Sequence, residues 1–369
     1  MSSKQGNTNE SFFFQPYMTK YREPFFQDLN QKLENRGIEF EVICGPTPND
    51  FVSSKSYGFK CVTLETKQRF KFTEFLKLSK NVSFPSGSVV IHFADFKYLS
   101  LYYVMMKRIL NRTQLFLHGQ GGYKNNTLIT KVIYNFAVAF TSGYICYNKF
   151  CEKELKKKLL PFLRKKVKSI DNTLYISSVE AVPYPEPENY NYKIAFIGRI
   201  RPRSGLEELL KASSIVKTKF PELTVEIIGS GEEPYIKTLK VEYPFANFIG
   251  GLYNQEDIIS ATKGCPIGVY GGDAGLSTVH YMSLGLAAIV HNDLLNHMGP
   301  EPSYVRDGYN GILFERNNIN DLADKICLLF GNEELTYNLR KNALKTFKEL
   351  SSPSMAEKLL DIIFNKEVK

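Results

Sequence analysis

Short apolar runs alternate with amphipathic helical patterns along both halves of the chain. In the first half, the runs Phe40–Cys44, Val89–Phe93 and Gln114–His118 have the length of buried strands, and the segments between them repeat apolar residues at helical spacing. The same alternation restarts at Lys193–Ile197. Strands that alternate with helices predict parallel sheets covered on both faces, so the sequence predicts an α/β fold of two Rossmann-like, doubly wound domains.

One irregular segment separates the two patterns. Residues 172–192 contain closely spaced prolines, and such a composition is typical of a linker. We expect an N-terminal domain over residues 1–185 and a C-terminal domain over residues 186–353. Two such domains imply a cleft between them, with ligands bound at the carboxyl ends of strands.

The stretch 265–291 has the pattern of a phosphate-binding βαβ unit. It predicts a strand at Pro266–Tyr270, the loop Gly271–Gly275, a helix at Leu276–Leu284 and a strand at Leu286–Val290. The N-terminus of such a helix directs backbone N–H groups out of the carboxyl edge of the sheet, where they can hold phosphate. An ordinary βαβ unit with turn glycines explains the same pattern.

Two further loops of the C-terminal domain follow predicted strands. The first, Gly198–Gly205, carries Arg199, Arg201 and Arg203, which suit a pyrophosphate or form a solvated basic loop. The second, Gly229–Gly231, permits close backbone approach. The sequence contains neither GxGxxG nor GxxxxGK[ST], which argues against a Rossmann dehydrogenase and a P-loop NTPase.

Charge distinguishes the two halves. The net charge is +9; residues 1–180 hold 27 Lys and Arg against 14 Asp and Glu, which gives +13, and residues 181–369 give −4. The stretch 67–77 alternates aromatic and cationic residues, Lys149–Lys166 predicts a lysine-rich helix, and no acidic residue occurs between 101 and 150. Such a surface suits an anionic membrane or a pyrophosphate-linked lipid; solvated helix faces are the alternative, and no motif supports nucleic acid.

Other classes lack their signatures. Six cysteines occur without CxxC pairs and predict reduced thiols. The five histidines show no HExxH spacing and there is no Asp-x-Asp, so we expect no tightly bound metal; His92, His291 and His297 are expected to be structural. Without a secretory signal or a spanning apolar segment, we expect a cytoplasmic protein.

The ordered set of loops resembles a known family. The succession of Gly198-Arg199, Gly229-Ser230-Gly231, Phe248-Ile249-Gly250, Gly275-Leu276-Ser277 and Gly285 is similar to the donor half of the GT-B-fold glycosyltransferases of family 4. Tyr21–Phe26 and His118-Gly119 resemble the polysaccharide-assembly members, such as those of O-antigen or capsule. The resemblance also implies that the final helix, residues 354–366, crosses back onto the first domain.

The resemblance implies a role for each loop. The nucleotide sugar lies with its diphosphate at the N-terminus of the 276–284 helix, and His118 stands over the donor sugar. The reaction retains anomeric configuration, the departing phosphate helps to deprotonate the acceptor hydroxyl, and no cofactor or metal is required. The implied donor-binding residues are Arg199, Arg203, Ser204, Gly229, Ser230, Gly231, Ile249, Gly250, Leu252, Gly275, Leu276, Ser277 and His280. The implied acceptor-binding residues are Tyr21, Arg22, Gly119 and Gln120, and the implied catalytic residues are His118, Arg199 and Asp273.

The sequence departs from the family at three positions. The family's Glu-x7-Glu frame falls on Gly272 and His280, and the lysine that precedes a glycine is Ser204. Asp273, one place along, could supply a carboxylate, and His280 could still hydrogen-bond a ribose. These departures leave the fold prediction intact, but they mean that the sequence does not identify the donor sugar.

The sequence therefore predicts a retaining transferase that moves a hexose or N-acetylhexosamine from a nucleotide sugar, with UDP favoured over GDP, to a lipid-linked or polysaccharide acceptor. It would act at the inner face of the plasma membrane. A GT-B sugar-nucleotide epimerase and a non-catalytic nucleotide-sugar or membrane-binding homologue are the alternatives.

Overall fold

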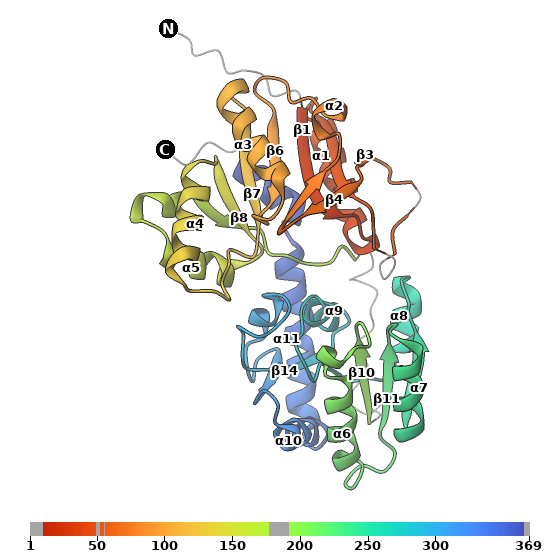
Figure 1. Cartoon of the computed structure of the whole chain (residues 1–369). Helices are drawn as coiled ribbons and strands as arrows, with labels where there is room; N and C mark the ends of the chain where they lie inside the picture. The colour runs from red at the N-terminus through yellow and green to blue at the C-terminus, as the bar shows by residue number, and fades with distance from the viewer. Residues whose placement is uncertain (1–9, 49–51, 55, 177–191, 365–369) are drawn as a thin grey trace. The chain divides into compact units, whose positions relative to one another are not determined.

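The structure is a computed structural model that describes residues 10–48, 52–54, 56–176 and 192–364. These residues form two compact units (Figure 1): the chain up to Tyr175 together with the chain from Pro353 makes the first, and Ile176–Ser352 makes the second. The predicted boundary between residues 185 and 186 lies outside the described residues. In the described part of the chain, no helix is long and apolar enough to cross a membrane.

The first unit is built on a parallel sheet in the order β3-β2-β1-β6-β7-β8-β9. The strands are β1 (Glu10–Tyr17), β2 (Glu39–Gly45), β3 (Lys60–Thr63), β6 (Val89–Phe93), β7 (Gln114–Gly119), β8 (Gly143–Cys146) and β9 (Val167–Ser169). The direction of winding reverses between β1 and β6, which makes this pair the switch point where an α/β sheet binds ligands. The stretch 67–77 contributes a separate antiparallel hairpin, β4 (Thr66–Arg69) and β5 (Phe72–Phe75), followed by the short helix α2 (Leu78–Asn81).

Helices cover both faces of this sheet and enclose two apolar cores. One core includes residues of α3 (Leu99–Asn111), α4 (Leu128–Ala139) and α5 (Lys149–Lys158), and the other includes residues of α1 (Glu23–Glu34) and α12 (Met355–Phe364). Side chains cap two of these helices: Thr127 accepts from the Thr130 N–H at the start of α4, and Asn148 accepts from the Cys151 N–H at the start of α5.

The end of the chain belongs to the first unit. In α12, Met355, Leu359 and Leu360 are buried in the same core as α1. The Lys358 Nζ lies 3.0 Å from the Asp171 carboxylate, and the Ala356 N–H donates to the Tyr175 hydroxyl at 3.0 Å. Positions 365 and 366 of the predicted helix lie outside the described residues.

The predicted helix Lys149–Lys166 is wrong in its second half. Helix α5 ends at Lys158, Leu159 is extended, and a separate 3₁₀ helix, η2, spans Pro161–Lys166. Proline has no N–H to donate and disfavours helical backbone in the residue before it, so the helix cannot continue through Pro161.

The second unit repeats the architecture with a six-stranded parallel sheet in the order β12-β11-β10-β13-β14-β15. Its strands are β10 (Lys193–Ile197), β11 (Thr224–Ile228), β12 (Ala246–Gly250), β13 (Ile267–Val269), β14 (Ala287–His291) and β15 (Gly311–Phe314). Its helices are α6 (Leu206–Val216), α7 (Glu233–Glu242), α8 (Gln255–Ala261), α9 (Ser277–Ser283), α10 (Ile319–Phe330) and α11 (Glu333–Ser351), with short 3₁₀ helices η4 (Pro202–Ser204) and η5 (Glu301–Tyr304). The stretch 265–291 thus forms β13, α9 and β14 as predicted, and winding reverses between β10 and β13.

Candidate functional site

A pocket of about 640 Å³ lies at the switch point of the first unit. Its lining comes from the ends of β1, β6 and β7 and from the loops that follow them. It contains all five residues predicted for this domain: Tyr21, Arg22, His118, Gly119 and Gln120. The sequence analysis missed Asp95 and Tyr147, which also line the pocket, although Asp95 follows a strand and could have been found by the same rule.

His118 is held neutral in this pocket. It is buried, and its Nδ1 lies 3.0 Å from the carbonyl oxygen of Ile145. A carbonyl oxygen only accepts, so Nδ1 carries the hydrogen and Nε2 of the neutral ring is a hydrogen-bond acceptor. Burial, followed by the charge of Arg22, lowers the pKa of His118 to about 4. Such a ring can accept a hydrogen bond from a hydroxyl group.

A buried lysine fixes the loop that follows His118. The Lys158 Nζ donates to the carbonyl oxygens of Gly122, at 2.6 Å, and Asn125, at 2.5 Å. Burial lowers the pKa of Lys158. In the sequence Lys158 is one of the cations of the predicted lysine-rich helix, whereas in the structure it holds in place a loop that lines the pocket.

In the second unit, the predicted diphosphate loops converge at the switch point between β10 and β13. A Cβ added to Gly198 would lie 2.9 Å from the ring of Tyr270 and 3.5 Å from the Ser277 Oγ, and one added to Gly205 would lie 1.9 Å from the Gly272 nitrogen. The loops after β10 and β13 therefore touch, and the start of α9, at Leu276 and Ser277, adjoins them.

The glycine loop 229–231 packs against backbone. A Cβ on Gly229 would lie 1.8 Å from the Gly198 oxygen, and one on Gly231 would lie 2.0 Å from the Ile200 oxygen. The Ser230 oxygen accepts from the Ile200 N–H at 2.9 Å. The sequence predicts that backbone comes close to these glycines. In the structure this backbone is that of the loop after β10.

Three further residues that the resemblance implies in donor binding, Ile249, Gly250 and Leu252, lie on the segment beside this loop. The Gly229 N–H donates to the Gly250 oxygen at 2.8 Å, at the end of β12. Ile249 is exposed and Leu252 is half-buried, so an apolar side chain is available to a flat ring beside the glycine loop.

The three arginines of the first loop have different environments. The Arg203 guanidinium pairs with Asp273, and that of Arg201 contacts the Met298 sulfur. Arg199 is half-buried, and burial of Tyr270 raises the pKa of that phenol to about 12 against the opposing charges of Arg201 and Arg199. The guanidinium groups of Arg199 and Arg201 therefore lie close to Tyr270, at the switch point.

Ser204 is committed to its own turn. It is buried, and its Oγ donates to the Arg201 oxygen at 2.6 Å. This hydrogen bond closes η4 and shapes the loop that carries the arginines.

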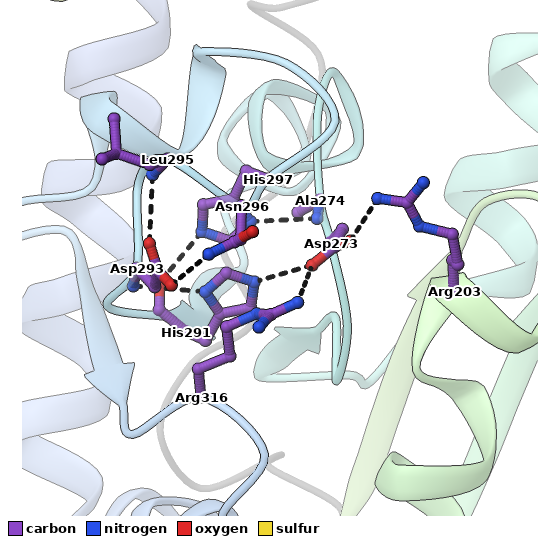
Figure 2. A network of polar contacts seen from close by, with 9 residues as sticks. All are labelled: Arg203, Asp273, Ala274, His291, Asp293, Leu295, Asn296, His297 and Arg316. Carbon is purple, nitrogen blue, oxygen red and sulfur yellow. Dashed lines mark hydrogen bonds and ion pairs between the residues drawn. The ribbon is translucent and has the colours of Figure 1, made fainter. Parts of the chain in front are cut away.

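Asp273 joins three loops at the same edge (Figure 2). Its carboxylate lies 3.0 Å from Arg203 Nη2, 3.3 Å from Arg316 Nη2 and 3.4 Å from His291 Nε2, and its side chain is 7% exposed. Burial raises the pKa of Asp273, but hydrogen bonds from Arg203 and Arg316 outweigh that effect and lower it overall. The sequence analysis missed Arg316, which follows β15 and so lies at the carboxyl edge where the other loops were sought.

Two stacked histidines complete this network. The rings of His291 and His297 are 3.6 Å apart and nearly parallel. The Ala274 N–H donates to His297 Nδ1 at 3.0 Å, so His297 carries its hydrogen on Nε2, which donates to the His291 oxygen at 2.9 Å. The Asp293 N–H donates to His291 Nδ1 at 3.2 Å, which leaves the His291 Nε2–H for Asp273. Both histidines are structural, as expected.

The two residues proposed to replace the family's carboxylates are enclosed. Asp273 is neutralised by its cations, which makes it an anchor of the loops rather than an open carboxylate. The Nε2 of His280 is buried without a hydrogen-bond partner among the described residues, and burial lowers the pKa of His280 to about 4. The ring therefore does not present this atom to solvent. Across the described ranges, no group of three His, Cys, Asp or Glu side chains could hold a metal ion.

Comparison with known proteins finds glycosyltransferases that are similar to this chain. Residues 183–346 match the family model of the glycosyl transferases group 1. Over 344 residues the chain is 25% identical to an uncharacterised glycosyltransferase of Methanocaldococcus jannaschii, covering 89% of the chain and 92% of the relative.

Solved structures extend the likeness to the whole chain. HepE of Anabaena in complex with UDP has a TM-score of 0.70 at 14% identity and covers 97% of this chain and 100% of its own. HepE is also solved with UDP-glucose. The lipopolysaccharide outer core galactosyltransferase WaaB has a TM-score of 0.65 at 14% identity and covers 97% of this chain and 99% of its own.

These comparisons confirm the predicted fold class: the chain has the GT-B fold of two Rossmann-like domains. More narrowly, its second unit matches the glycosyl transferases of group 1. The assignment to family 4 and the retaining type stay predictions, as do the roles of the individual site residues.

Buried neutral histidines make stability pH-dependent. Burial lowers the pKa of all five histidines, to about 4 for His92, His118 and His280 and to about 3 for His297, with His291 shifted in the same direction. Because the unfolded chain binds these protons near pH 6.5 and the folded chain does not, their contribution to stability is complete above pH 6.5 or so and is lost as the pH falls. We expect the free energy of unfolding to fall between pH 7.5 and 5.5 or so, by on the order of 1 kcal/mol per histidine. Urea titrations across this range measure it, and a flat profile would contradict the assignment.

Replacing the anchoring carboxylate isolates its contribution. Asp273→Asn keeps the side-chain shape but leaves Arg203 and Arg316 without their anion, so we expect the second unit to lose roughly 3 kcal/mol of stability in urea unfolding. Asp293→Asn is the matched control, because Asp293 lies in the same network but its carboxylate accepts from the Asn296 amide and the Leu295 N–H rather than from a cation. Equal losses for the two variants would show that Asp273 is not the anchor.

Proposed function

We propose that this chain is a glycosyltransferase that moves a hexose or N-acetylhexosamine from a nucleotide sugar, with UDP favoured, to a lipid-linked or polysaccharide acceptor. The observation that carries the proposal is the convergence of the predicted diphosphate loops at the switch point of the unit that matches the group 1 family. The UDP and UDP-glucose complexes of HepE support the choice of base.

In this proposal the second unit holds the donor. The C1–O bond between sugar and β-phosphate breaks, and negative charge develops on the departing diphosphate. Arg199 and the N–H groups at the start of α9, near Leu276 and Ser277, are fixed donors that stabilise this charge without reorganising. Ile249 and Leu252 offer apolar contact to the base. No metal is needed in this scheme, since the cation is supplied by Arg199.

The first unit holds the acceptor. Its pocket offers Arg22 to an anionic group and Gln120 to hydroxyl groups, and the neutral His118 accepts a hydrogen bond through Nε2. The new bond joins the acceptor oxygen to C1, and the acceptor proton passes to the departing phosphate. Transfer on the same face of the sugar retains the anomeric configuration.

A non-catalytic nucleotide-sugar-binding protein is the second candidate. The observation that favours it concerns the three positions discussed above, none of which offers an open carboxylate: Gly272 has no side chain, Asp273 is paired with two arginines, and His280 Nε2 is enclosed. Such a protein would bind the donor without turning it over.

We assign the reaction to the cytoplasmic face of a membrane, in the synthesis of a surface polysaccharide. The +13 charge of the first half supports this setting, because anionic lipid surfaces attract basic proteins.

Donor binding tests the second unit. We expect UDP-sugars to raise the melting temperature, and Arg199→Ala to weaken their binding about tenfold or more, because a charge-assisted contact to phosphate is lost. Lys263→Ala is the control. Lys263 is exposed and lies before β13, so this substitution removes the same charge at the opposite edge of the sheet. If neither UDP-sugars nor GDP-sugars raise the melting temperature, the proposal is overturned. If a nucleotide sugar raises the melting temperature but is neither hydrolysed nor transferred, the second candidate is favoured.

Arg22→Ala tests the acceptor pocket through two independent measurements. Removing the neighbouring cation should raise the pKa of His118, observed by NMR titration of its ring, because the charge of Arg22 lowers that pKa. In transfer assays the acceptor KM should rise about tenfold or more while donor binding stays unchanged. Lys80→Ala, an exposed residue of α2, is the control. An unchanged acceptor KM beside a shifted pKa would remove Arg22 from the acceptor site.

A further inference from the structure

Helix α4 carries an apolar face that none of the described residues of the first unit covers. Tyr134, Ala137 and Val138 on one side of this helix are buried in the core. On the other side Leu128 and Ile129 are 76% and 71% exposed, and Val132, Phe136 and Phe140 are exposed as well. Positions 129, 132, 136 and 140 recur at helical spacing and so share one face.

The neighbouring elements extend this face. Arg108 near the end of α3 donates to the Phe140 oxygen at 3.2 Å, and Lys166 at the end of η2 donates to the Thr141 oxygen at 2.9 Å. Both neighbours also carry exposed apolar side chains: Met106, Ile109 and Leu110 on α3, and Leu160 and Phe162 beside or within η2. We call the exposed apolar side chains of α3, α4 and η2 the α4 face. An exposed apolar cluster of this size marks an interaction site.

Exposed cations lie in the segments that border the α4 face, and its α3 and α4 segments hold no acidic residue. Arg112, Arg164 and Lys165 are exposed beside it, and the sequence holds no Asp or Glu from position 101 to 150. Apolar side chains ringed by Lys and Arg match the interfacial zone of an anionic bilayer, where tails meet charged headgroups. Self-association of two α4 faces would place like charges opposite one another in a two-fold interface, which is unfavourable.

We propose that the α4 face docks on an anionic lipid bilayer, with α4 lying in the plane of the interface. The sequence pointed to the basic charge of this half of the chain but not to this surface. Tyr134 on the buried side of α4 lines the pocket of the first unit, so docking places that pocket within about one helix diameter, roughly 10 Å, of the lipid headgroups. This last step rests on the proposed function and favours an acceptor that is itself membrane-anchored, whereas docking does not depend on any activity.

Vesicle flotation of the full chain tests the docking. We expect binding to vesicles of phosphatidylcholine with about one third phosphatidylglycerol, little binding to phosphatidylcholine alone, and weaker binding as salt rises. The triple variant Ile129→Ser, Val132→Ser, Phe136→Ser should bind at least about tenfold more weakly, because it removes the apolar contribution. Val241→Ser, which changes a 79% exposed residue of α7 in the other unit, should bind like the wild type.

Three outcomes would overturn the proposal. The first is that the wild type does not bind the anionic vesicles, and the second is that the triple variant binds them as well as the wild type does. The third is that the wild type binds no vesicles but forms a dimer in light scattering, which the triple variant does not form. Thermal stabilisation by UDP-sugars, measured on the same samples, shows that the variant is folded. It also separates a failure of docking from a failure of the proposed donor binding.

Discussion

The donor edge of the second unit depends on one buried carboxylate. Removing Asp273 from water is costly, and two guanidinium groups and one imidazole N–H offset that cost. Through these contacts the loop before α9 is tied to the loops after β10, β14 and β15. Arg199, Leu276 and Ser277, which are predicted to hold the diphosphate, lie on or beside two of those loops. The ion-pair network therefore helps to set their spacing, together with the hydrogen bonds that shape and join these loops. A carboxylate so neutralised is a weak base, which fits an anchor better than a sugar ligand.

The sequence was sufficient for the fold and for the edge of each sheet where the candidate sites lie. Parallel strands share one carboxyl edge, so Arg199, Gly229 and Ser277 could be placed together without coordinates. It was not sufficient for pairings across loops. Arg316 lies 43 positions from Asp273, and no local pattern connects them. The glycines at 229 and 231 were correctly read as sites of close backbone approach, but which backbone approaches depends on how neighbouring loops pack.

The first unit shows the same limit in its charged residues. In the sequence, Lys158 is one of a run of cations after Cys151, with nothing to distinguish it from Lys157. The structure buries Lys158 against the carbonyl oxygens of the pocket loop and leaves Lys157 exposed beside Glu154. Helix α4 poses the converse problem. Its apolar residues occupy both faces, a pattern typical of a buried helix, and only the packing reveals that one face is uncovered.

The cations are arranged differently in the two halves of the chain, and each arrangement suits a different proposed anion, a diphosphate in one case and a lipid surface in the other. In the slightly acidic second half, Arg199, Arg201, Arg203 and Arg316 gather at one sheet edge, three of them in a single loop. A diphosphate is a compact anion, and clustered guanidinium groups in fixed geometry match it. In the first half the exposed cations are spread over the β4–β5 hairpin, the residue after α3, α5 and η2. A dispersed positive surface gains little from a point anion but complements an extended negative one. In the proposed scheme, the asymmetry in net charge corresponds to two different recognition tasks, one in each unit.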